Sequence, residues 1–156
     1  MRRKDKEITD EEVLNDILSR SRICRIGLVD KGTAYIVPVY YAFSEGSIFI
    51  HSAPHGRKMD LIRQNPKVSF EIEYSDRIIR DEIPCRWTSK FRSVMGEGTI
   101  SIVTDSLQKQ KGLDLIMRKY GAPKDLSYDG ISLSEMVILV LSIDSITGKQ
   151  AGMWEK

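Results

Sequence analysis

Few residues in this chain suit disulfide, metal or histidine chemistry. Its 156 residues include only two cysteines and two histidines. Cys24 and Cys85 lie far apart and match no zinc or redox spacing, so we expect two reduced thiols rather than a disulfide. His51 and His55 show no metal-ligand spacing, and we expect no metal site. No Ser-His-Asp arrangement or carboxylate pair stands out as a catalytic constellation.

Long hydrophobic runs and an excess of charge of one sign are also missing. No run of about 18 apolar residues could span a membrane, and the basic start "MRRKDK" lacks the apolar segment of a signal peptide. The 24 Lys and Arg nearly balance the 22 Asp and Glu, for a net charge of +2, which provides no basic face for nucleic acid. We therefore expect a cytoplasmic protein that contacts neither membranes nor nucleic acid. Its length fits a single domain over residues 1–156.

The chain does contain a series of short β patterns separated by turns. Residues 23–29 alternate between apolar and polar, and a second β-rich run follows at 33–43. The segment "DKG" between them is typical of a turn, so the sequence predicts a hairpin. Further strands are expected at "SIFIHS", at "KVSFEIEY", over 91–103 and in the strongly apolar "EMVILVLSIDSITGK", which should lie centrally. Strands joined mostly by hairpins, with inserted helices, indicate a mainly β fold: an antiparallel barrel decorated by helices.

Three helices are predicted between these strands. Thr9-Asp10-Glu11-Glu12 has the form of a capping box, with Thr9 as the cap of a first helix. A short second helix over 56–64 should end near Asn65, because the residue before a proline avoids the α conformation. A third helix is capped by Asp105 or Ser106 and runs to Tyr120.

Several residues interrupt the strand patterns. Pro38 cannot donate to a strand ladder, which predicts a sheet edge, a bulge, or backbone that faces a ligand. Gly96 and Gly98 indicate a bend or a close backbone approach. Tyr40 and Tyr41 are consecutive on a strand, so one of them is expected in the core.

The segment "HSAPHGRKMDLI" (51–62) combines the groups that bind a phosphate. Ser52, Arg57 and Lys58 supply a hydroxyl, a guanidinium and an ammonium beside the free amides of a helix N-terminus. The alternative is that the two cations are solvated charges on a surface helix. Because cations near a helix N-terminus oppose its dipole by about 0.3–1 kcal/mol each, their position favours a bound anion.

The ordered set of "VPV", "HSAPHGRKMDLIRQNPKVSFEI" and "CRWTSKFRSVMGEG" resembles the flavin-binding split-barrel family of pyridoxamine 5'-phosphate oxidase, in its nitroimidazole-resistance (Nim-type) branch. The resemblance implies an FMN-binding antiparallel split β-barrel. It also implies a homodimer that holds two flavins in clefts at the subunit interface, with FMN as the expected flavin and FAD as the alternative.

The resemblance further implies roles for single residues. The phosphate contacts lie in the 51–58 segment, the backbone of the "VPV" segment lies along the isoalloxazine, and the "FRSV" segment reaches the flavin ring. The flavin-binding positions implied in this way are Val37, Pro38, Val39, His51, Ser52, Arg57, Lys58, Arg92 and Ser93.

Four side chains leave alternatives open. His51 is either a proton donor or ring contact at the flavin, and so the one candidate catalytic residue, or a packed or capping histidine. Cys85 and Trp87 either line the cleft of the facing subunit, with Trp87 on the cofactor, or pack in the core. Trp154 either stacks on a flavin or a partner, or is a loose surface residue. His55 is expected in an exposed loop.

The functional expectation is a flavin-dependent oxidoreductase that reduces small electron-poor compounds such as nitroimidazoles or nitroaromatics. The alternative is a flavin carrier or redox sensor without turnover, and a third interpretation is a barrel that binds another anion. The C-terminal "GKQAGMWEK" departs from the substrate-binding pattern of true pyridoxamine phosphate oxidases, which argues against oxidation of a vitamin B6 phosphate. Fold alone does not decide among these functions.

Overall fold

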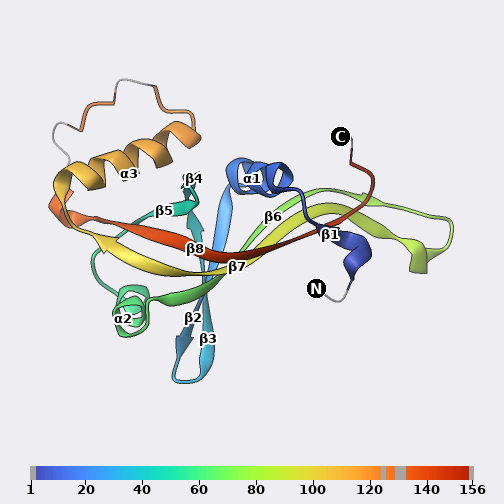
Figure 1. The fold of residues 1–156 in the computed structure, drawn as a ribbon, viewed down its shortest axis with the longest axis horizontal. Helices are drawn as coiled ribbons and strands as arrows, with labels where there is room; N and C mark the ends of the chain where they lie inside the picture. The colour runs from blue at the N-terminus through green and yellow to red at the C-terminus, as the bar shows by residue number, and fades with distance from the viewer. Residues whose placement is uncertain (1–2, 124–125, 129–132, 155–156) are drawn as a thin grey trace.

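Eight strands form one curved, antiparallel sheet in the computed structural model of the chain, which describes residues 3–123, 126–128 and 133–154 (Figure 1). The strand order is β3-β2-β6-β7-β8-β5-β4, and β1 pairs with β8. The strands are β1 (Glu7–Ile8), β2 (Ile23–Asp30), β3 (Thr33–Tyr40), β4 (Ala42–Ser44), β5 (Ser47–Ser52), β6 (Lys67–Ile79), β7 (Thr88–Val103) and β8 (Val137–Ala151). The predicted mainly β, antiparallel architecture is confirmed.

The predicted first hairpin is confirmed, and its second strand lies at an edge of the sheet. β2 and β3 pair from Ile23↔Tyr40 to Asp30↔Thr33, and β3 ends the strand order. An edge strand tolerates a proline because one of its sides is unpaired, which accounts for Pro38. The predicted run to residue 43 is divided: the strand stops at Tyr40, and Ala42–Ser44 forms β4, which pairs with β5.

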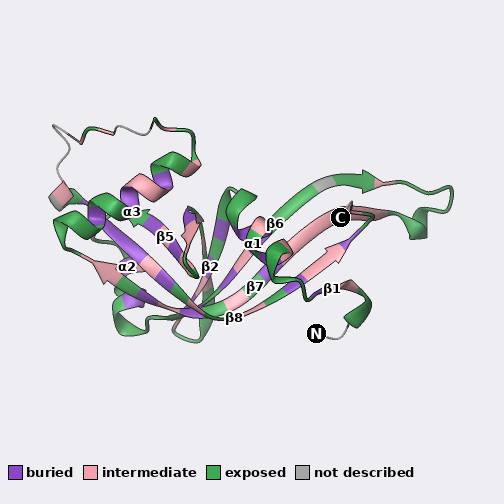
Figure 2. Cartoon of the chain, turned by 45° about the horizontal axis from the view of Figure 1, so that its top comes forward, coloured by how far each residue is buried: buried purple, intermediate pink, exposed green. Residues whose placement is uncertain are grey.

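The larger hydrophobic core gathers buried side chains from β2, β5, β6, β7 and β8, and Figure 2 marks the buried positions along these strands. Cys24, Ile26 and Leu28 alternate into it from β2, as their spacing predicts. β8 lies between β7 and β5, and Ile138 and Leu139 are fully buried on its two faces, which confirms its central position. Each such aliphatic side chain contributes about 1.5–3 kcal/mol by leaving water.

The three α-helices are α1 (Glu11–Arg20), α2 (Arg57–Gln64) and α3 (Ser106–Lys119), with short 3-10 turns η1 (Lys4–Lys6), η2 (Pro84–Arg86) and η3 (Leu133–Glu135). Two of the three, α1 and α2, pack on this core, and α3 packs with Ile138 in a second, smaller cluster. Each helix is preceded by a capping residue or by a glycine. The cap of α1 is Asp10 and not the predicted Thr9: the Asp10 carboxylate accepts the Glu12 N–H at 2.9 Å. A carboxylate also interacts favourably with the helix dipole, so Asp10 is the better cap of the two. Asp105 caps α3 in the same way.

Tyr41 and Tyr120 join α3 to the barrel. Tyr41 is fully buried and Tyr40 is 65% exposed, which confirms that one of the pair is in the core. The Tyr41 hydroxyl donates to the Leu18 carbonyl at 2.7 Å. The Tyr120 hydroxyl donates to the Arg22 carbonyl at 2.6 Å and accepts the Tyr41 N–H at 3.2 Å. The end of α3 is thereby tied to the end of α1 and to the start of β4.

The β6–β7 hairpin is longer than the sequence predicts and extends beyond the core. β6 continues to Ile79 and β7 begins at Thr88, so both strands exceed the predicted runs. This extension, residues 75–91, is called the arm below. Figure 1 shows it at the end of the molecule opposite α2. Within the described part of the chain, no helix is long and apolar enough to cross a membrane.

The two thiols have opposite environments, which gives a first testable prediction. Cys24 is fully buried, and burial raises the pKa of its thiol to about 12, whereas Cys85 in η2 is exposed. Since the thiolate is the reactive form, we expect a chromogenic disulfide reagent to modify Cys85 at least about 100-fold faster than Cys24. The Cys85→Ser variant should react only after denaturation. Two rapidly reacting thiols in the native protein would contradict the buried position of Cys24.

Candidate functional site

The start of α2 forms a cationic corner beside the β2–β3 hairpin. We use the name α2 corner for Ser52 at the end of β5 together with Arg57 and Lys58 in the first turn of α2. Gly56 precedes the helix with φ 106°, in the left-handed region that favours glycine, and no side chain caps the helix. The first amides of an uncapped helix lack backbone acceptors, so they remain available to an anion.

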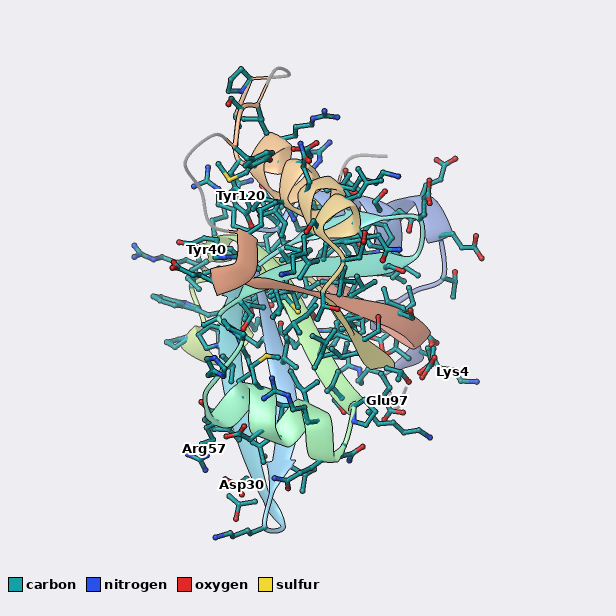
Figure 3. The ribbon with its side chains drawn as sticks, turned by 90° about the vertical axis from the view of Figure 1, so that its left-hand side faces the viewer. Lys4, Asp30, Tyr40, Arg57, Glu97 and Tyr120 are labelled. Carbon is teal, nitrogen blue, oxygen red and sulfur yellow. The ribbon has the colours of Figure 1, made fainter. Side chains whose placement is uncertain are left out.

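Arg57 is held from two sides by the hairpin. Its Nε and Nη2 atoms lie 2.8 Å and 2.7 Å from Oδ2 of Asp30, the last residue of β2. Its guanidinium carbon also lies 4.3 Å from the centre of the Tyr35 ring on β3. Figure 3 shows Arg57 and Asp30 next to each other below α2. Two contacts of different kinds fix the plane of the guanidinium as well as its position.

Lys58 is half-buried and lacks an acidic partner among the described residues. Loss of hydration lowers the pKa of its ammonium. The same desolvation, with repulsion from Lys58, lowers the pKa of the neighbouring His51, so this imidazole is neutral at pH 7. His51 is exposed, which contradicts the packed alternative, and His55 is exposed as predicted. A bound anion would supply the negative charge that Lys58 lacks.

Ser52 lies at the base of the corner, and its hydroxyl is engaged within the protein. The side chain is buried, and Oγ donates to the Ala53 carbonyl at 2.9 Å and lies 3.6 Å from the Met59 sulfur. A phosphate oxygen only accepts hydrogen bonds, so the hydroxyl must turn away from Ala53 to bind one. Arg63, in the last turn of α2, donates to the Pro54 carbonyl at 2.7 Å and so fixes the loop between Ser52 and Gly56.

The "VPV" segment follows Tyr35 on the same edge strand that contacts Arg57. Val37 and Val39 are half-buried toward the core, and Pro38 points outward and is exposed. The structure therefore brings the α2 corner and the β3 edge together on one side of the barrel, as the predicted flavin positions require.

Arg92, Ser93 and Trp87 lie elsewhere, on β7 and at the arm. The Arg92 Nε donates to Oε1 of Gln150 at 3.1 Å, and Ser93 pairs with Glu73 and Lys149 in the sheet. Trp87 is 48% exposed at the start of β7. Trp87 belongs to the arm, which Figure 1 shows at the end of the molecule opposite α2, and Arg92 and Ser93 follow the arm on β7.

Two of the alternatives for the arm and tail are wrong. Cys85 and Trp87 do not pack in the core: Cys85 is exposed, and Trp87 holds its place by donating from Nε1 to the Asp81 carbonyl at 2.8 Å. Trp154 is not a loose surface residue. Its ring lies 4.4 Å from the Arg92 guanidinium and 4.5 Å from the Lys90 ammonium, and its Nε1 donates to Ala151 at 3.0 Å.

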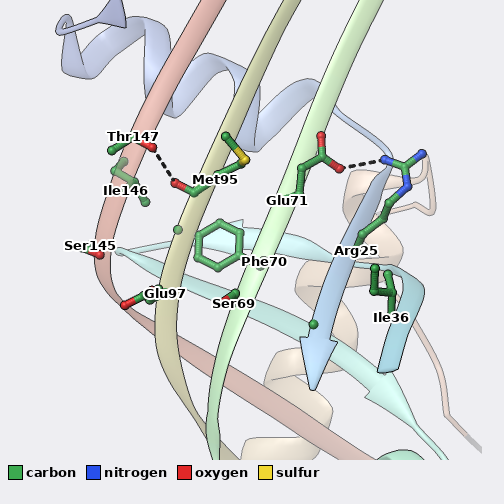
Figure 4. Close-up of a pocket in the computed structure, with 12 residues that line it drawn as sticks. Arg25, Ile36, Ser69, Phe70, Glu71, Met95, Glu97, Ser145, Ile146 and Thr147 are labelled. Atoms are coloured by element: carbon green, nitrogen blue, oxygen red, sulfur yellow. Dashed lines mark hydrogen bonds and ion pairs between the residues drawn. The ribbon is translucent and has the colours of Figure 1, made fainter. Parts of the chain in front are cut away.

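A hollow of about 660 Å³ lies on the sheet next to the β3 edge, lined by residues of β2, β3, β6, β7 and β8. Ile36 and Met95 border it, and they are 62% and 49% exposed. Gly27 and Gly96 contribute no side chains to its floor, and Arg25 pairs with Glu71 at its rim at 2.9 Å (Figure 4). This face is apolar at its centre and charged at its edge, which is the composition of a contact surface.

Asp30 and Tyr35 are site residues that the sequence does not predict. Asp30 is 27 positions from its partner Arg57, and only the pairing of the hairpin beside α2 brings the two together. The excess of cations in the first turn of α2 is the one sequence signal that some anionic group should lie nearby.

Comparison with known proteins identifies the family. The family described as Pyridoxamine 5'-phosphate oxidase matches residues 10–150. The chain belongs to this family. A curated protein similar to this chain, an uncharacterised protein of Rhizobium meliloti (strain 1021), is 32% identical to it over 65 residues. The alignment spans 42% of this chain and 42% of that relative, so the chain spans about two fifths of the length of the curated relative it matches.

Solved structures of similar proteins confirm the split-barrel fold of this pyridoxamine 5'-phosphate oxidase family member. A candidate 5-nitroimidazole antibiotic resistance protein from Bacteroides thetaiotaomicron has a TM-score of 0.82 at 24% identity, over 92% of this chain and 85% of that one. The FAD and heme binding protein from Mycobacterium smegmatis has a TM-score of 0.85 at 17% identity, over 97% and 76%. A FAD-binding protein from Mesorhizobium loti has a TM-score of 0.68 at 22% identity, over 94% and 98%.

Proposed function

We propose that this protein binds a flavin whose phosphate lies in the α2 corner and whose ring lies along the Val37–Val39 backbone. The observation that carries the proposal is Lys58, a half-buried cation without a carboxylate partner in the described structure, next to the uncapped start of α2. A phosphate there would be bound by an ammonium, a guanidinium and free amides together. Similar folds in proteins named for FAD binding support this choice of ligand.

The proposed activity is reduction of small, flat, electron-poor compounds such as nitroaromatics. A bound flavin supplies the electron transfer, and the chain's residues hold the phosphate, orient the ring and shape the pocket. Reducing a nitro group to a nitroso group takes two electrons from the reduced flavin and two protons, and releases water. The similarity to a candidate nitroimidazole resistance protein supports this substrate class.

The site is proposed to be completed by a second copy of the chain. Trp87 lies on the arm, at the end of the molecule opposite α2, and Arg92 and Ser93 follow the arm on β7. The exposed apolar residues Ile36 and Met95 at the hollow favour a self-contact. A twofold dimer is the commonest way to bury such a face. Light scattering should therefore give twice the mass of the chain.

The visible absorption spectrum of gently purified protein tests the proposal first. We expect the paired bands of an oxidised flavin, and chromatography of the denatured protein should then identify the released compound. Colourless protein that also fails to take up added FMN and FAD would contradict the proposal, and the α2 corner would need another anion.

A non-catalytic flavin carrier is the second candidate function. His51 adjoins the α2 corner, and its lowered pKa makes the imidazolium, the acidic form of the side chain, a minor species at pH 7. A single-turnover experiment separates the two functions. The bound flavin is photoreduced without oxygen and mixed with a nitroaromatic compound. Reoxidation that matches formation of the nitroso product indicates a reductase, and a stable reduced spectrum indicates a carrier.

A further inference from the structure

We infer that Asp30 makes the α2 corner selective for a singly charged phosphate within a diester or pyrophosphate, as in FAD, over the terminal phosphomonoester of FMN. This inference rests on the proposed flavin site. It concerns a residue that does not itself bind the ligand. Asp30 acts through Arg57, and its effect follows from the donors and the charge that it leaves available.

Asp30 occupies the side of the Arg57 guanidinium that best binds two oxygens. An arginine forms its strongest phosphate contacts with paired N–H groups directed at two acceptors. Here Nε and Nη2 both point at Oδ2 of Asp30, at 2.8 Å and 2.7 Å. The Tyr35 ring at 4.3 Å covers one face of the guanidinium. The N–H groups left for a ligand are the two on Nη1 and the second one on Nη2.

The number of free donors suits a phosphate with few acceptor oxygens. A phosphomonoester presents three terminal oxygens, whereas a phosphate within a diester presents two. The Ser52 hydroxyl already donates to Ala53 at 2.9 Å, so it adds no donor without turning. Lys58 and the amides at the start of α2 then provide most of the remaining hydrogen bonds.

The charge balance favours the same ligand. Asp30 neutralises Arg57, so Lys58 is the remaining positive charge of the corner, and His51 is neutral at pH 7. A phosphomonoester carries a charge of about −1.5 to −2 at pH 7, and each phosphate of a diester carries about −1. The Asp30 side chain is only 22% exposed, so water screens its repulsion of the second charge poorly.

Competition between FMN and FAD tests this inference. The purified protein is dialysed against equal, saturating concentrations of both flavins, and the bound fraction is released and quantified by chromatography. We expect mostly FAD on the wild type. The Asp30→Asn variant should shift the bound ratio toward FMN by about tenfold, as expected for one additional ligand charge near a carboxylate.

Two further variants separate charge from positioning. Asp30→Ser loses both the charge and the contact that orients Arg57, so total flavin affinity should fall while the ratio shifts toward FMN as in Asp30→Asn. Asp16→Asn removes a carboxylate of equal charge from its pair with Arg20 on α1 and should leave the ratio unchanged.

The outcomes distinguish this inference from the proposed function. Two results would overturn the selectivity and leave flavin binding established. One is wild-type protein that binds FMN to the same extent as FAD, and the other is an Asp30→Asn ratio within about twofold of the wild-type ratio. Wild-type protein that binds neither flavin would overturn the proposed function, and with it the inference.

Discussion

The Gly98→Ala variant is expected to lose about 3 kcal/mol or more of its free energy of unfolding, and its Tm should fall by roughly 10 °C. A Cβ atom at position 98 would lie 2.2 Å from the Ser142 carbonyl oxygen and 2.7 Å from a methyl group of Leu141. The pairing of β7 with β8 shifts register between Glu97 and Gly98, so the two backbones approach closely at this bulge. Backbone atoms of a central strand cannot move aside cheaply.

Gly27→Ala is the matched control for that loss. Gly27 also lies in a strand of the same sheet, but the nearest atom to its added Cβ would be the Ser69 carbonyl oxygen at 3.6 Å, an ordinary contact. We expect a change within about 1 kcal/mol, since alanine also lowers the entropy of the unfolded chain. Thermal unfolding followed by circular dichroism measures both variants. A Gly98→Ala protein as stable as Gly27→Ala would contradict the close approach of β7 and β8.

The Arg57→Ala, Lys58→Ala double variant is expected to lose flavin affinity by at least about 100-fold. Each cation makes a charge-assisted hydrogen bond worth about 1.5–3 kcal/mol when its partner is charged. The substitutions remove two cations that oppose the dipole of α2, which offsets part of the cost of leaving Asp30 without its partner Arg57, so the variant should still fold. Fluorescence quenching of added FMN and FAD measures the affinity, and circular dichroism checks the fold.

Its control is the Arg20→Ala, Lys111→Ala double variant. Its substitutions lie on α1 and α3 and lower the net charge by the same amount as those of the test variant. Both of these residues are exposed and lie outside the α2 corner. If the control lost as much affinity as the test variant, the flavin would be attracted by overall charge, and the assignment of the phosphate to Arg57 and Lys58 would be wrong. Unchanged affinity in the test variant would have the same consequence.

Local patterns predict much of this fold because they depend on near neighbours in the sequence. Alternation places Cys24, Ile26 and Leu28 on one face of β2, and the sheet edge is one of the three alternatives that a proline in mid-strand leaves open. Gly96 and Gly98 indicate the close approach of two backbones, which the structure shows at both positions. The cap of α1 differs by one residue, because Thr9 and Asp10 are both good caps and the backbone decides between them.

The unpredicted features depend on contacts between distant segments. Arg57 meets Asp30 only because α2 packs beside the β2–β3 hairpin. Trp154 is ordered by Arg92 and Lys90, which β7 brings to it from more than 60 positions away. A sequence read segment by segment shows that these residues can pair with something, but only the order of the strands in the sheet shows with what.

Pro38 has a consequence for how the protein behaves in a crowded solution. An open sheet edge can recruit a strand from another molecule, and repeated strand addition leads to fibres. Pro38 interrupts the donor pattern in the middle of β3, the strand that ends the sheet order. The edge of the sheet thus stays unpaired while it resists the addition of a foreign strand. Resistance to strand addition is, in this protein, an effect of one missing N–H group on β3.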